Sequence, residues 1–187
     1  MSNRIPRLEF SDLDRDLAAA LSARVKRLGY LGEFFRVMGH QPAALKGFIE
    51  FTESAKAGLD KRLVELLALT VAGFFKNHYE LNQHERLSVR LGYGRPWVEA
   101  VELRNPEAAA GLSDLERRLQ RFAIDSVKSH GRVGQEEFDS LVGELGVASA
   151  VAVLMIIARY IAHAYVANVL RIAPPVPSIW RDGFNGD

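Results

Sequence analysis

The spacing of apolar residues constrains the fold of this chain more than any other feature. Near the N-terminus they recur every three or four residues, at Leu13, Leu17, Leu21, Val25 and Leu28. This spacing places side chains on one face of an α-helix, and similar patterns follow along most of the chain. We find no sustained alternation of apolar and polar residues, which is the pattern typical of strands. The sequence therefore predicts an all-α protein.

Capping and breaking residues predict where the helices begin and end. Ser11 is the expected N-cap of the first helix, Asp60 caps another, and Ser113 with Glu116 forms a capping box. Prolines at 174, 175 and 177 end the last helix, so residues 173–187 are expected to be extended. We expect helices at about 12–28, 42–57, 61–75, 78–91, 96–103, 113–129, 135–145 and 148–170, with a short aromatic segment at 31–37.

Composition excludes several classes of function. The 187 residues include 24 Lys and Arg, 23 Asp and Glu, and no Cys. The near-neutral balance gives no support for nucleic-acid binding. Without cysteine there is no disulfide, thiolate nucleophile, iron–sulfur cluster or cysteine-ligated zinc. Residues 1–10 lack the apolar run of a secretory signal, and we expect a cytoplasmic protein with one domain over residues 1–187.

The last predicted helix, 148–170, is apolar and long enough to raise the possibility of a membrane span. Arg159 and His163 interrupt it, and an arginine at the centre of a span costs about 2.5–3.5 kcal/mol on insertion scales. We therefore expect no membrane and a helix buried on nearly all sides, in the core or at a subunit interface. Because Arg159 and His163 are four residues apart, they share a face and are expected to meet a carboxylate there.

The densest group of polar and titratable residues runs from Asn77 to Glu85. Within it, Glu80 and His84 are four residues apart and are neighbours on a helix. A carboxylate beside an imidazole can form an acid–base pair that works near neutral pH. The alternative is a solvated ion pair, which the spacing alone favours. A metal site is not expected, because no third ligand follows at a standard spacing.

Glu65 interrupts the apolar segment 63–69 and is the second candidate. If its carboxylate is buried, it needs a partner and could serve as a general acid or base. If the helix is amphipathic, Glu65 faces solvent and pairs with Arg62 or Lys61. The local pattern favours the solvent-facing alternative.

Residues 62–92 resemble the carboxymuconolactone decarboxylase family, whose superfamily includes the alkylhydroperoxidase D-like proteins. In the peroxidase branch a glutamate precedes a Cys-x-x-Cys and a histidine in a set register. That register places the glutamate on Glu65, the cysteines on Asn77 and Glu80, and the histidine on His84; Tyr79 matches the tyrosine before the second cysteine. The resemblance covers about residues 25–172 and is to the cysteine-less, decarboxylase-like branch.

This resemblance implies an alkylhydroperoxidase D-like helical bundle with a core at about 25–172 and a tail at 173–187. It also implies a homo-oligomer, a trimer or hexamer. The implied activity is that of a carboxy-lyase, which acts on a small organic acid or lactone from aromatic breakdown without a cofactor. In this scheme His84 donates a proton, Glu80 orients His84, and Glu65 is a second acid–base group.

Tyr79, Asn77 and Arg62 are the expected substrate-binding residues of such an enzyme. A guanidinium suits a substrate carboxylate, and Arg62 and Arg159 are the candidates for it. The alternative is a non-enzymatic, oligomeric ligand-binding protein on the same scaffold. Thiol peroxidase activity is not expected, because both motif cysteines are absent. A pocket that opens onto His84 would favour the enzyme, and a sealed environment would favour the non-enzymatic alternative.

Overall fold

The structure, a computed structural model, describes residues 5–181, 183 and 184. These residues form helices and contain no strand, so the prediction of an all-α protein is confirmed for the described part of the chain. The elements are the short 3₁₀ helix η1 (Phe10–Asp12) and the α-helices α1 (Arg15–Leu28), α2 (Glu33–Met38), α3 (Pro42–Ala57), α4 (Lys61–Phe74), α5 (His78–Arg90), α6 (Arg95–Glu102), α7 (Asp114–Lys128), α8 (Gln135–Leu145) and α9 (Val147–Val169).

The chain divides into two compact units, one up to Ser54 and one from Ala55 onward. The first unit contains η1, α1, α2 and most of α3, and its fully buried leucines include Leu17, Leu21 and Leu45. The predicted core at 25–172 crosses the boundary between these units. A single domain over residues 1–187 stays a prediction.

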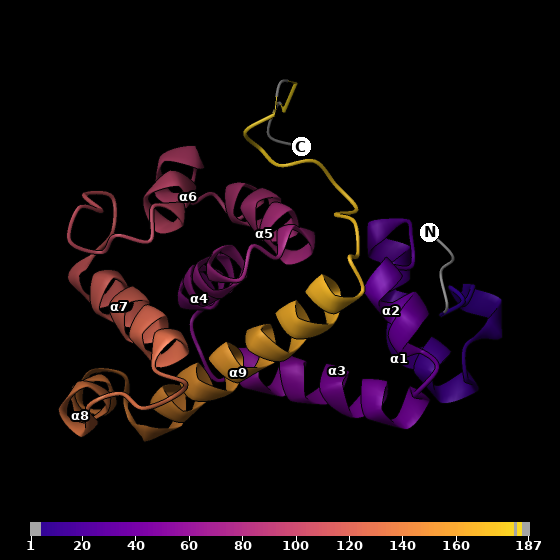
Figure 1. The fold of residues 1–187 in the computed structure, drawn as a ribbon, viewed down its shortest axis with the longest axis horizontal. Helices are drawn as coiled ribbons and strands as arrows, with labels where there is room; N and C mark the ends of the chain where they lie inside the picture. The colour runs from indigo at the N-terminus through magenta and orange to yellow at the C-terminus, as the bar shows by residue number, and fades with distance from the viewer. Residues whose placement is uncertain (1–4, 182, 185–187) are drawn as a thin grey trace. The chain divides into compact units, whose positions relative to one another are not determined.

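Helix α4 is the centre of the second unit, and α5, α6, α7 and α9 all pack against it (Figure 1). Every residue from Leu63 to Gly73 is buried. A helix surrounded in this way is apolar on all faces rather than on one stripe. This burial explains the continuous apolar run in the sequence, and it places Glu65 inside the unit.

Most predicted helix ends are confirmed within one or two residues. The Asp60 side chain accepts a hydrogen bond from the backbone N–H of Arg62, and Ser113 with Glu116 forms the predicted capping box. Ser11 as the first N-cap is wrong. Residues 10–12 form η1, and the backbone is extended at Leu13, so α1 begins later and Asp14 caps it.

By length and composition α9 could cross a membrane, but half of its most apolar segment is buried inside the fold. It packs against α4 and α8 and carries the buried side chains of Arg159 and His163. We therefore regard α9 as a core helix. Burial on nearly all sides is only partly right for this chain, because one apolar face is exposed at Val147, Val151, Leu154, Met155, Tyr165 and Val169.

After α9 the chain continues without further helix as far as it is described, as the prolines predict. The side chain of Ile179 is fully buried and joins the apolar core of the second unit. Residues 182 and 185–187 of the predicted tail, and residues 1–4 of the N-terminal segment, lie outside the described residues.

Candidate active site

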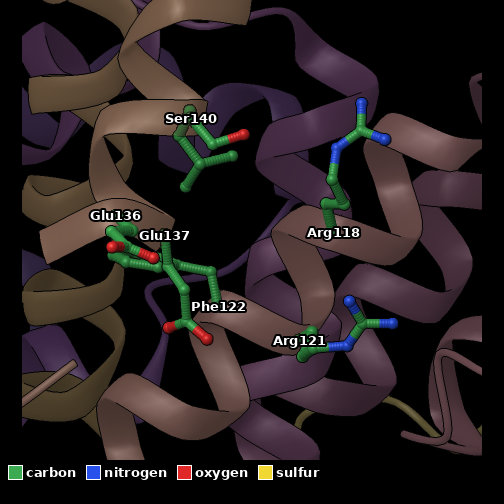
Figure 2. A pocket seen from close by; sticks show the side chains of 7 residues that line it. Arg118, Arg121, Phe122, Glu136, Glu137 and Ser140 are labelled. Carbon is green, nitrogen blue, oxygen red and sulfur yellow. The ribbon is translucent and has the colours of Figure 1, made fainter. Parts of the chain in front are cut away.

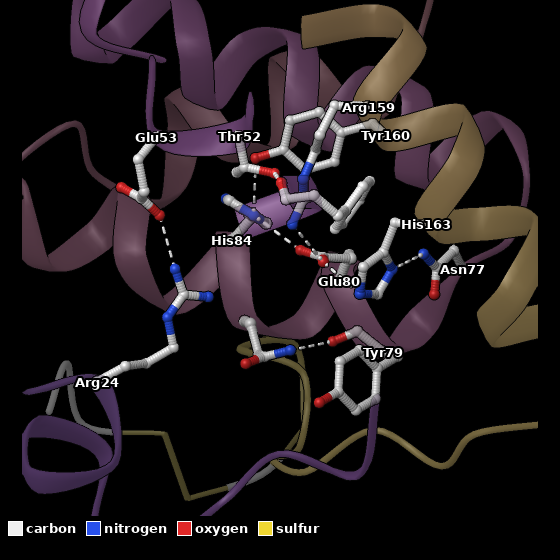
Figure 3. Close-up of polar contacts among 12 residues, drawn as sticks. Arg24, Thr52, Glu53, Asn77, Tyr79, Glu80, His84, Arg159, Tyr160 and His163 are labelled. Carbon is white, nitrogen blue, oxygen red and sulfur yellow. Dashed lines mark hydrogen bonds and ion pairs between the residues drawn. The ribbon is translucent and has the colours of Figure 1, made fainter. Parts of the chain in front are cut away.

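Glu65, Glu80 and His84 meet inside the second unit. Figure 3 shows the side chains of Glu80 and His84 pointing toward each other. Glu65 comes from α4, and the other two come from α5. A tight turn joins the helices: Lys76 has a left-handed backbone with φ of 52°, and the backbone N–H of Asn77 bonds to the carbonyl of Ala72 at 2.8 Å. This turn brings α5 back against α4.

The His84 ring lies between two carboxylates. Its Nδ1 is 2.6 Å from Glu65 Oε2, and its Nε2 is 3.0 Å from Glu80 Oε2. A carboxylate accepts hydrogen bonds, so both ring nitrogens carry hydrogen and the ring is an imidazolium. The predicted contact between Glu80 and His84 is confirmed, but the solvated form that the spacing favoured is wrong, because both side chains are buried. The solvent-facing Glu65 favoured by the local pattern is also wrong.

The two carboxylates set the protonation of His84. Burial lowers the pKa of a histidine, but the charge and hydrogen bonds of Glu65 and Glu80 outweigh burial and raise the pKa of His84 above its usual value. The relative exposures of Glu65, Glu80 and His84 are 4%, 6% and 6%. The site therefore holds a proton in a region from which water is largely excluded.

Glu80 is held as a carboxylate by Arg159 and His163 from α9. Its Oε1 is 3.2 Å from Arg159 and 2.9 Å from His163 Nε2. Burial raises the pKa of a carboxyl group, but Arg159 and His163 outweigh it, so the pKa of Glu80 lies well below its usual value. The prediction that Arg159 and His163 meet a carboxylate on a shared face is confirmed.

His163 is oriented by two predicted site residues. Asn77 Nδ2 is 3.4 Å from His163 Nδ1, and the Tyr79 ring stacks on the imidazole with centroids 5.6 Å apart. Since Nε2 faces Glu80, it carries the hydrogen and Nδ1 accepts from Asn77. Burial, which outweighs the attraction of Glu80, lowers the pKa of His163 and keeps it neutral. Asn77 and Tyr79 are thus linked to the cluster by their contacts with His163.

Arg62 has other partners. Its Nε donates to Glu116 Oε1 at 2.8 Å, and its guanidinium lies over the rings of Tyr93 and Trp97, at 5.1 and 4.8 Å from their centroids. Trp97 Nε1 donates to the same Glu116 oxygen at 2.8 Å. Arg62 therefore braces α4 against α6 and α7, and a role in substrate binding stays a prediction.

Tyr160 belongs to the cluster and was not predicted from the sequence. Its hydroxyl is 3.0 Å from His84 Nε2, and its ring lies edge-on to the imidazole. Tyr160 lies next to Arg159 on α9, and the ring of Tyr160 also contacts the Arg159 guanidinium at 4.2 Å. The available signal was a group of three polar-tipped residues, 159, 160 and 163, in an otherwise apolar helix.

A cavity of about 260 Å³ lies elsewhere, between α7 and α8 (Figure 2). Phe122 and Leu141 provide its apolar lining, with Arg118 and Arg121 from α7 and Glu136 and Glu137 from α8. None of the residues that line this cavity belongs to the His84 cluster.

Among the described residues, no group of three or more His, Asp or Glu side chains is arranged to hold a metal ion.

The arrangement around His84 suits proton transfer. It combines a protonated imidazole, two flanking carboxylates and a phenol within hydrogen-bond distance. Such a group can donate one proton to a developing carbanion or alkoxide and recover it afterwards. The same contacts also make a fully paired polar network, which stabilises a core without any chemistry.

A scan against models of protein families finds no match, and a search of curated proteins finds none. Solved structures do match. One is an alkylhydroperoxidase AhpD core, an uncharacterized peroxidase-related protein from Ralstonia eutropha JMP134, with TM-score 0.78 and 20% identity over 97% of this chain and 93% of the other. Another is a cysteine-to-alanine variant of the debrominase Bmp8 in complex with 2,3,4-tribromopyrrole, with TM-score 0.78 and 19% identity over 92% of each chain. At these identities the likeness concerns the fold, and the chain has the alkylhydroperoxidase D-like helical fold that the sequence predicts.

Proposed function

We propose that this chain is an acid–base enzyme of the carboxymuconolactone decarboxylase type, with a small organic acid or lactone as substrate. The observation that carries the proposal is the His84 imidazolium held between Glu65 and Glu80 at 2.6 and 3.0 Å. A carboxylate at Glu80 in place of a thiol favours proton transfer over redox chemistry.

His84 is the proton donor in this proposal. When the carboxylate of the substrate leaves as CO₂, the electron pair of the broken C–C bond stays on carbon as a carbanion or enolate. The Nε2–H of His84 protonates that carbon, and after the products leave, water supplies a new proton to the ring and becomes hydroxide. Glu65 keeps Nδ1–H bonded throughout and so fixes the ring orientation.

Glu80 accepts a hydrogen bond from His84 and also carries a negative charge beside the ring. Because Arg159 and His163 hold it ionised, it stabilises the imidazolium before the transfer. Asn77 and Tyr79 support this arrangement by orienting His163. No residue of this scheme needs a metal or an organic cofactor, and we propose none.

A second candidate is a non-enzymatic, ligand-binding protein on the same scaffold. It is favoured by the burial of the cluster, since Glu65, Glu80 and His84 are each at most 6% exposed, which is the sealed environment expected of this alternative. The cavity between α7 and α8 does not open onto His84. The second candidate is also favoured by the three donors that converge on Glu80. In that case the cluster only stabilises the fold.

Turnover of a panel of small carboxylic acids and lactones, followed by CO₂ release, separates these candidates. If the chain is the proposed enzyme, the native chain releases CO₂. The rate should fall at least about 100-fold in His84→Gln, which lacks the acidic proton. His78→Gln is the matched control, because His78 is exposed on the same helix. Ligand-induced stabilisation without turnover by the native chain would support the second candidate instead.

A thiol peroxidase is not proposed, although one structural neighbour is described as peroxidase-related. Peroxide reduction by that chemistry needs an attacking thiolate and a resolving thiol, and the chain contains no cysteine. The complex of Bmp8 with a tribromopyrrole supports only that this fold can hold a small ring compound.

We also propose that the chain is a cytoplasmic homo-oligomer, a trimer or hexamer, with α9 at the subunit contact. The support is the exposed apolar face of α9, which carries Val147, Val151, Leu154, Met155, Tyr165 and Val169. Apolar side chains in a continuous stripe gain free energy when a partner covers them. Light scattering of the purified chain measures the assembly size directly.

A further inference from the structure

Residues 176–180, which we call the strap, lie across α5 and α6. Side chains of these two helices hold the backbone carbonyls of the strap: Asn82 Nδ2 donates to Val176 at 2.9 Å, Arg86 Nε to Pro177 at 2.8 Å, and Arg95 to Ile179. The Ile179 side chain is fully buried in the core. The strap is therefore docked by backbone hydrogen bonds and by one apolar anchor.

Glu85 receives the middle of the strap. Its Oε2 accepts from Ser178 Oγ at 2.6 Å and from the backbone N–H of Ile179 at 2.8 Å. Glu85 is buried and lies on α5, the helix that also carries Glu80 and His84. The Ser178 hydroxyl and the Ile179 backbone N–H both need an acceptor here, so Glu85 is part of the site at which the strap docks.

Glu102 receives the end of the strap. Its Oε2 accepts from Trp180 Nε1 at 2.6 Å. Its Oε1 is buried, and no hydrogen-bond donor to it is found among the described residues. A buried carboxylate oxygen without a donor is costly. Glu85, another carboxyl group, lies within hydrogen-bond reach of Glu102, and a hydrogen bond between two carboxyl groups requires a proton on one of them.

The titration of Glu102 agrees with this geometry. Burial and then the nearby charge of Glu85 raise the pKa of Glu102 to about 7, although Trp180 and Arg104 act in the opposite direction. The charged groups that face Glu102 are Glu85 from α5 and Arg104 from the segment after α6. Glu102 therefore stays protonated through the mildly acidic range.

We propose that the strap is a proton-dependent latch, docked while Glu85 and Glu102 share one proton and released when that proton is lost. Without the proton, the adjacent carboxylates of buried Glu85 and partly buried Glu102 repel each other, and the strap that covers them moves away so that water can reach both. The latch is independent of the function proposed for His84.

The direction of the pH dependence follows from where the proton is bound. The docked state holds its proton up to about pH 7, whereas a solvated Glu102 in the released state loses it near its ordinary value of 4.5. Docking therefore weakens as the pH rises from 4.5 to about 7 and stays weak above it. Each pKa unit is a tenfold change in the equilibrium, and because Glu102 is partly exposed we expect about tenfold in all.

NMR spectroscopy of the full chain tests the latch. The chain has two tryptophans, so the Trp180 indole N–H is assigned by its loss in Trp180→Phe. In the native chain this resonance should shift with a midpoint near pH 7. Glu102→Gln keeps an acceptor for Trp180 and supplies a permanent N–H toward Glu85, so its resonance should not titrate in that range. Glu99→Gln, exposed on the same helix, should titrate as the native chain does.

Hydrogen exchange of the Ile179 amide separates release from simple deprotonation. At pH 8 we expect exchange about tenfold faster in the native chain than in Glu102→Gln, with the intrinsic exchange rate equal because the pH is the same. If Glu102→Gln does not fold, Glu85→Gln replaces it, since its amide oxygen can still accept from Ser178 and Ile179. A flat Trp180 titration, or equal amide exchange in the two proteins, overturns the proposal.

Discussion

Replacement of Glu80 by Gln tests how far the buried charges depend on one another. Glu80 Oε1 accepts from Arg159 and His163, and Oε2 accepts from His84. A glutamine has nearly the same shape but carries no charge and only one oxygen. Its NH₂ group must then face a donor, and the buried Arg159 guanidinium loses the carboxylate that balances it.

The size of the effect follows from this burial. Breaking a buried, hydrogen-bonded ion pair by removing one partner costs about 3–5 kcal/mol, because the other charge stays in a poorly solvated site. Arg159 and His163 are 6% and 2% exposed, so water cannot replace the lost oxygen without opening the fold. For a chain of this length, this corresponds to a fall in melting temperature of about 6–20 °C.

Urea denaturation at pH 7 and fixed protein concentration measures the change. Glu99→Gln removes an exposed carboxylate of the same type and should change the unfolding free energy by less than about 0.5 kcal/mol. Arg159→Met should be destabilising alone, and the double variant with Glu80→Gln should lose at least about 1 kcal/mol less than the sum of the single losses. A loss below about 1 kcal/mol for Glu80→Gln, or strict additivity in the double variant, would refute the reasoning.

Three further predictions concern His84, Ile179 and Leu154. The raised pKa of His84 means that its contribution to stability is complete below about pH 6.5 and is lost as the pH rises through its folded pKa; His84→Gln should flatten this decline in unfolding free energies measured across pH. Ile179→Ala should cost about 2–5 kcal/mol in urea denaturation, because it leaves a cavity at a fully buried position, and a loss under about 1 kcal/mol would mean that the strap is not anchored there. Leu154→Glu places a charge on the exposed face of α9 and should reduce the assembly size in light scattering, whereas an unchanged size would exclude this face as the contact.

The helices were predictable because their signals are local. Asp60 and the Ser113–Glu116 box act on backbone groups within three residues, and the spacing of apolar residues reports one face of one helix. The Glu80–His84 contact was predictable for the same reason, since both side chains lie on α5.

The environment of Glu65 depends on packing that a single helix cannot reveal. The local pattern favoured an amphipathic helix over segment 63–69, with Glu65 facing solvent. In the structure, four neighbouring helices bury α4 on every side. Family resemblance placed Glu65 in the site where periodicity did not. Tyr160 was missed because its contact with His84 joins residues 76 positions apart, and aromatic residues in an apolar helix are ordinary core residues.

The charges around His84 cancel, which affects how quickly a ligand arrives. Glu65 and Glu80 contribute two negative charges, and Arg159 with the His84 imidazolium contributes two positive ones. The cluster therefore has no net monopole, and the whole chain is close to neutral at +1. A charged ligand gains almost no long-range electrostatic steering from such a site. Its association rate should change little between low and physiological ionic strength, and discrimination among ligands depends on contacts made after arrival.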